Sequence, residues 1–128
     1  MNENYKLISV GDVASLGRVV LNETLNLTGA EISLNVLPKN VSVPFVHAHK
    51  NNEEIYVILD GKGYLYIDGK EIAIAKGDAF RVDPKGERCI KASEDSSINF
   101  MCIQVKADSL DGFTLDDGII TQTKPSWL

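Results

Sequence analysis

Apolar and polar residues alternate with a period of two along most of the chain. This alternation is typical of β-strands that bury one face, because side chains on a strand point alternately to opposite sides. The alternating runs are short, rich in Val, Ile and aromatic residues, and bounded by Gly, Asp, Asn or Pro. The pattern predicts strands over residues 6–10, 17–27, 30–37, 43–49, 54–60, 63–67, 71–75, 79–82, 88–92 and 98–105.

Turn residues separate these strands. Asp68-Gly69 lies between two strand-like halves and favours a two-residue hairpin turn, because both positions tolerate positive φ angles. The strands on either side are bounded by two further turn sequences, Gly61-Lys62-Gly63 and Lys76-Gly77-Asp78. No segment has a helical period of useful length. The chain is therefore predicted to form an all-β barrel or sandwich.

A chain of 128 residues fits one domain. We expect N-terminal strands over residues 1–29 and a barrel core over residues 30–107. Residues 108–128 differ, since their polarity is mixed and their period is weak. We expect this tail to pack on the barrel or on a second subunit.

Charge and composition narrow the function classes. Eighteen acidic against thirteen basic residues give a net charge of −5, which disfavours nucleic acid as a partner. No apolar run approaches the ~18 residues of a membrane span, and the N-terminus lacks the pattern of a secretory signal. We therefore expect a cytoplasmic protein with no membrane partner, in which Cys89 and Cys102 are free thiols.

Both histidines of the chain occur in the tripeptide His47-Ala48-His49. On a strand they would project from the same face, and Glu54 at the start of the next strand could meet them. Two imidazoles and a carboxylate suit non-haem iron and related divalent ions. The alternative is two surface histidines beside a solvated acidic turn.

Two longer motifs resemble those of the cupin superfamily. Residues 44–61 match its first motif, His-x-His-x(3–4)-Glu-x(6)-Gly, with His47, His49, Glu54 and Gly61 in place. Residues 77–89 are similar to its second motif, Gly-x(5)-Pro-x-Gly-x(2)-His, although the spacing between Gly77 and the proline is one residue longer. The resemblance implies a single-domain double-stranded β-helix, a jelly-roll-like barrel.

The resemblance also implies a metal site formed by His47, His49, Glu54 and the residue at the fourth ligand position, which here is Cys89. Three interpretations of Cys89 stay open. Its thiolate completes a four-ligand site, or it stands beside a three-ligand site that keeps open positions, or it is a small buried residue that packs the barrel.

Aromatic and sulfur side chains near these motifs are candidates for the pocket lining. The predicted set is Phe45, Tyr56, Phe80 and Met101. Each of them could equally fill an ordinary barrel core. Arg81 and Arg88 could bind an anionic substrate, but solvated or salt-bridged surface positions are expected for both.

The resemblance suggests a metal-binding cupin that acts on a small polar metabolite by oxygenation, isomerisation or epimerisation. The cofactor would be a divalent transition metal ion, namely Fe, Ni, Zn or Mn. The resemblance also implies a homodimer, for which residues 6–27 are the candidate edge. The alternative is a non-catalytic module that binds a small ligand or sugar, with a structural metal or none.

Overall fold

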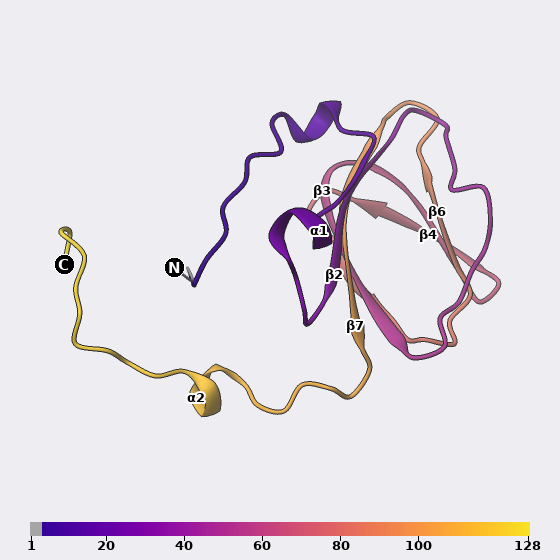
Figure 1. Cartoon of the computed structure of the whole chain (residues 1–128). Helices are drawn as coiled ribbons and strands as arrows, with labels where there is room; N and C mark the ends of the chain where they lie inside the picture. Colours follow the sequence, from indigo (N-terminus) through magenta and orange to yellow (C-terminus); the bar gives the residue numbers. More distant parts are fainter. Residues whose placement is uncertain (1–3) are drawn as a thin grey trace.

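The computed structural model describes residues 4–128 of the chain. It contains seven β-strands and three short helical turns (Figure 1). In chain order these are η1 (Val13–Ser15), β1 (Arg18–Val20), α1 (Asn22–Leu25), β2 (Glu31–Leu37), β3 (Asn52–Ile67), β4 (Lys70–Ala75), β5 (Ala79–Val82), β6 (Arg88–Ala92), β7 (Ile98–Lys106) and α2 (Thr114–Asp117). The predicted all-β class is confirmed.

The long strand β3 organises the barrel. The strand order is β1-β2-β7-β3-β4, all pairs are antiparallel, and β5 and β6 also pair with β3. The first half of β3 pairs with β7 and β5, whereas its second half pairs with β4 and β6. Figure 1 accordingly shows β2 and β7 on one side of the barrel and β4 and β6 on the other.

Gly61 and Gly63 let β3 continue where the sequence predicts a break. The register shifts between Ile58 and Asp60, and Gly61 has a φ of 76°, in the left-handed region that favours glycine. A Cβ at Gly61 would clash with the Ser97 carbonyl, and one at Gly63 would clash with the Lys91 carbonyl. The two glycines therefore allow close strand contacts, and β3 bends rather than ends.

The core lies between the two sides of the barrel. Alternate residues of β3 face it, which is why burial alternates along much of that strand, and on β7 Phe100 and Cys102 face it with the less buried Met101 between them. The buried apolar cluster consists of Tyr56, Ile58, Leu65, Ile74, Val82, Ile90, Ala92, Ile98, Phe100 and Cys102. At about 1.5–3 kcal/mol for each large apolar side chain, this cluster is the main stabilising contribution in the domain.

The hairpin prediction at Asp68-Gly69 is confirmed, since Ile67 pairs with Lys70 and both turn residues have positive φ angles, 47° and 87°. The strand predicted over residues 43–49 is wrong in detail. This segment runs along β6 with isolated bridges at Ser42 and His47 rather than a continuous ladder. Pro44, which has no N–H to donate, lies within it.

The N-terminal prediction also needs correction. Residues 6–10 form no strand, and residues 17–27 contain the short β1 followed by α1 instead of one strand. Asn26 ends α1 in the left-handed conformation, with a φ of 53°. Residues 1–3 of the expected N-terminal segment lie outside the described residues.

The C-terminal tail contrasts with the barrel, because its large apolar side chains are exposed. Leu115 is 98% and Ile120 is 95% exposed, and the tail extends away from the barrel (Figure 1). The homodimer, which would give these side chains a surface to pack on, stays a prediction. Within residues 4–128, the structure has no helix with the length and apolar character needed to cross a membrane.

Candidate metal centre

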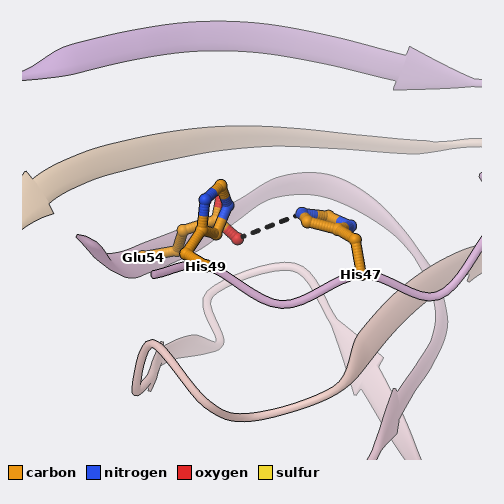
Figure 2. Close-up of side chains that lie close together, drawn as sticks. All are labelled: His47, His49 and Glu54. Atoms are coloured by element: carbon orange, nitrogen blue, oxygen red, sulfur yellow. Dashed lines mark ion pairs between the residues drawn. The ribbon is translucent and has the colours of Figure 1, made fainter. Parts of the chain in front are cut away.

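His47, His49 and Glu54 converge at one end of the barrel. One ligand atom from each of them lies within 4.8 Å of the other two (Figure 2). The two histidines come from the extended segment beside β6, and Glu54 comes from the beginning of β3. Backbone bonds hold that segment: the His47 N–H donates to the Arg88 carbonyl at 3.1 Å, and the His49 N–H donates to the Pro84 carbonyl at 2.8 Å.

Each imidazole has one buried nitrogen without a hydrogen-bond partner among the described residues. His49 Nε2 lies 3.3 Å and His47 Nε2 lies 3.8 Å from the nearest Glu54 carboxylate oxygen. His47 Nδ1 and His49 Nε2 are buried and have no hydrogen-bond partner among the described residues. Leaving such an atom unpaired costs roughly 1–3 kcal/mol, so a ligand for these nitrogens would be stabilising.

Glu54 is tightly held by neighbours. It is 3% exposed, and its Oε1 accepts hydrogen bonds from Arg88 Nη1 and the Tyr56 hydroxyl, both at 2.6 Å. The Cys102 thiol donates to Oε2 at 3.3 Å. Burial opposes ionisation of this carboxyl, but these hydrogen bonds, with His49 and Arg88 nearby, outweigh it and lower its pKa. Glu54 is therefore a fixed carboxylate.

Arg88 was expected at the surface, and this prediction is wrong, because only 1% of the residue is exposed. Its side chain also donates to the Gly86 carbonyl at 2.9 Å and to the Asp83 carbonyl at 2.7 Å. The physical reason is strand pairing: Arg88 is the bridge partner of His47, so both side chains project to the same face. Arg81, by contrast, is exposed and paired with Asp83, as expected.

Cys89 lines the cavity but is not part of the three-residue cluster. Its thiol donates to the Val43 carbonyl at 3.2 Å, and its sulfur lies 3.6 Å from the Ser42 hydroxyl. Cys89 and Cys102 are both free thiols, so no disulfide links them. The sulfur beside the cluster is Cys102, whose thiol pKa is raised to about 12 by burial and by the Glu54 carboxylate.

His47 also has a displaced pKa. Burial lowers its pKa below the ordinary value, as do the nearby Arg88 and His49, and these effects outweigh the attraction of Glu54. A neutral imidazole is the form that binds a metal ion, so burial favours the ligand-competent state.

The cluster opens onto a cavity of about 270 Å³. Of the four residues expected in the pocket lining, Phe45 and Tyr56 line this cavity, whereas Phe80 and Met101 do not. Phe80 is on the inner face but stacks on Tyr56, with ring centroids 5.0 Å apart, and lies behind that ring. Met101 lies between the inward-facing Phe100 and Cys102, so it projects to the outer face.

Sequence reasoning missed four polar residues of the cavity: Arg18, Ser33, Asn35 and Gln104. They lie on β1, β2 and β7, outside the two motifs, and only the pairing of these strands brings them to the cluster. The alternation of β2 was a usable signal, because Ser33 and Asn35 share one parity on a strand predicted to have a buried face.

The residues present fit a divalent transition metal ion. Two imidazoles and one carboxylate are a ligand set that such ions use, and the buried His49 Nε2 beside Glu54 has no hydrogen-bond partner among the described residues. The positive charge of Arg88 disfavours a bound cation. Arg88 binds Glu54 through Oε1, however, and leaves Oε2 with only the weak Cys102 thiol donor and His49 nearby.

Fold and site together define a small antiparallel β-barrel with a candidate metal centre inside it. The family model Cupin_2, the cupin domain, matches residues 34–104, and this protein belongs to that family. The expected cupin fold is thus confirmed. A cupin protein of Bacteroides fragilis is similar to it, with 52% identity, a TM-score of 0.89, and coverage of 94% of this chain and 99% of that one.

Two further comparisons are more distant, and the likeness to the first of them shows the fold alone. A predicted oxalate decarboxylase of Thermotoga maritima has 21% identity and a TM-score of 0.56, covering 77% of this chain and 99% of that one. An uncharacterised protein of Methanocaldococcus jannaschii is 31% identical over 61 residues, which are 48% of this chain. The match spans about half, 49%, of the length of that relative.

Proposed function

We propose that this cupin binds a divalent transition metal ion through His47, His49 and Glu54 and acts on a small polar metabolite. The observation that carries the proposal is the convergence of three ligand atoms within 4.8 Å at the wall of a 270 Å³ cavity. The buried His49 Nε2, which lies 3.3 Å from Glu54 and has no hydrogen-bond partner within residues 4–128, adds to it. Iron, nickel, zinc and manganese are the candidate ions.

The protein's own residues would hold and orient the reactants. Tyr56 and Arg88 fix the Glu54 carboxylate, and Phe45 and Phe100 contribute apolar walls to the cavity. A bound metal ion would supply Lewis acidity at coordination positions that three protein ligands leave open. Oxygenation, isomerisation and epimerisation of a small polar substrate are the reaction types that suit such a site.

A second candidate function, a non-catalytic module that binds a small ligand, is favoured by one observation. Arg88 compensates the Glu54 charge at 2.6 Å, so the buried carboxylate has a cationic partner without any metal ion. In that case ligand affinity would persist after chelation, whereas turnover would require the ion.

Elemental analysis of protein loaded separately with Fe²⁺, Mn²⁺, Ni²⁺ and Zn²⁺ tests the proposal. We expect near-equal amounts of metal and protein for at least one ion, and a large loss in His47→Ala. Cys89→Ser is the matched control, since Cys89 lines the same cavity but lies outside the cluster, and should keep the metal.

A wild-type protein that takes up none of the four ions would overturn metal binding at this site. Metal content unchanged in His47→Ala would do the same for the assigned ligands. Circular dichroism of each variant checks that the barrel is folded, so that lost metal is not mistaken for lost structure.

A further inference from the structure

We propose that the cavity selects a small organic carboxylate and that Arg18, at its mouth, recognises the negative charge. This inference rests on the proposed function in that it concerns the same cavity. It adds the chemical class of the ligand and a residue from outside both sequence motifs.

Strand register places Arg18 over the cavity. Arg18 on β1 pairs with Asn35 on β2, and Asn35 pairs with Phe100 on β7. Paired residues project to the same face of a sheet, so the three side chains form one row. All three line the cavity, and Arg18 is at its exposed end. An arginine in this row reaches the ligand space from the solvent side.

The charges around the cavity do not match those of the whole protein. The chain carries a net charge of −5. Glu54 is the one carboxylate among the cavity-lining residues within 4–128, and Arg88 pairs with it at 2.6 Å. Arg18 makes no ion pair with any residue of that range within 4 Å. The cavity therefore has an uncompensated positive charge in an otherwise acidic protein.

Neutral polar groups beside Arg18 can complete the recognition of a carboxylate. Ser33 is only 5% exposed. Its hydroxyl oxygen accepts a hydrogen bond from Asn35 Nδ2 at 3.0 Å, so the hydroxyl proton is free to be donated to a ligand. Gln104 is engaged elsewhere, since it donates to the exposed Glu31, which does not line the cavity.

The donor set favours a carboxylate over a phosphate. One guanidinium fork and one hydroxyl match the two oxygens of a carboxylate, and Arg–carboxylate pairs are frequently bidentate. A dianionic phosphate is usually held by several cations or by a cradle of backbone N–H groups. The aromatic walls of Phe45, Tyr56 and Phe100 then suit an apolar remainder of the ligand.

The test measures charge selectivity in chelator-treated protein. Acetate, lactate, pyruvate and benzoate are each compared with the neutral amide of the same shape, by ligand-observed NMR and calorimetric titration. At low ionic strength we expect at least one acid to bind about tenfold more tightly than its amide, with the difference shrinking as salt is added. Inorganic phosphate is the competing anion and should bind more weakly than that acid.

Matched variants assign the selectivity to Arg18. Arg18→Gln should reduce the preference for the acid to within about twofold, and Arg18→Lys should retain part of it, because an ammonium keeps the charge without the fork. Arg81→Gln is the control, since Arg81 is an exposed arginine that does not line the cavity. It removes the same charge from the protein and should leave the preference intact.

The inference is wrong if no acid binds more tightly than its amide, if phosphate outcompetes every acid, or if Arg18→Gln keeps the preference. These results are separable from failure of the proposed function. Protein that never loads metal can still show the acid preference after chelation, and protein that loads metal can bind acids and amides equally.

Discussion

Two segments form the site, and they contribute opposite kinds of chemistry. The histidine segment, residues 47–54, supplies electron-pair donors: two imidazoles and a carboxylate whose ligand atoms converge within 4.8 Å. The arginine segment, residues 83–89, supplies a cation, Arg88, one residue before Cys89, the position where the cupin motif would place a fourth ligand. Its Arg88 is 1% exposed and bound to Glu54, while Cys89 is directed to the Val43 carbonyl.

The two segments differ in what they would contribute with and without a bound metal ion. A carboxylate buried to 3% exposure needs a positive partner, and Arg88 provides one without a metal ion. The unsatisfied imidazole nitrogens, however, gain nothing from Arg88. The arginine segment therefore stabilises the metal-free barrel, and the histidine segment would favour the metal-bound barrel that we propose.

The largest effect is expected for Arg88→Met. This change leaves Glu54 as a buried carboxylate without its cation and should lower the free energy of unfolding by about 3–5 kcal/mol. Urea denaturation of chelated protein measures it. Arg81→Met, which breaks only an exposed pair with Asp83, should cost less than about 1 kcal/mol. Equal losses in the two variants would mean that the buried pair has no special role.

The second-largest effect is expected when one of the proposed metal ligands of the histidine segment is removed. His49→Ala should weaken metal binding at least about 100-fold, because loss even of a group that only supports a ligand typically costs 10–100-fold. Competition with a chromophoric chelator gives the affinity. Unchanged affinity in His49→Ala would remove this residue from the proposed centre.

Arg88→Gln is expected to change metal affinity by a smaller factor than His49→Ala and in the opposite direction, towards tighter binding. The amide keeps a donor near Glu54 but removes a positive charge close to the bound cation, so affinity should rise about tenfold. The same chelator competition measures it, on variant protein shown to be folded by circular dichroism. A fall in affinity would show that Arg88 orients Glu54 for the metal more than it repels the ion.

Acidification should weaken the metal-free barrel through His47. Its pKa in the folded protein lies below the ordinary value near 6.5, so unfolding takes up a proton and stability falls as pH drops below about 6.5. Urea denaturation of chelated protein at about pH 7.5 and about pH 5.5 measures the loss. His47→Gln should show a smaller loss over the same range, and an identical loss in both proteins would contradict the assignment.

The smallest effect is expected for Cys89→Ser. A hydroxyl can keep the hydrogen bond to the Val43 carbonyl, so the free energy of unfolding should change by less than about 1 kcal/mol. Zinc affinity, measured by chelator competition, should also stay within about twofold. A clear loss of zinc affinity would make the sulfur a ligand after all.

Local patterns predicted much of this structure. The period-two alternation identified β2 and β4–β7 to within a residue or two, and Asp68-Gly69 identified the hairpin, because these signals depend on neighbouring residues alone. The alternation failed at residues 17–27, where it predicts one strand and the chain forms β1 and then α1. It also split β3 at Gly61 and Gly63, whose role is set by the carbonyls of other strands.

The sequence by itself indicated the barrel class and, through the spacing of the first motif, the candidate set His47, His49 and Glu54. Only the tertiary structure decided that Arg88 rather than Cys89 faces Glu54, and that Arg18 reaches the cavity. Neighbouring strand residues face opposite sides, so a register slip of one residue exchanges them. That register depends on pairing between distant segments, which no local pattern encodes.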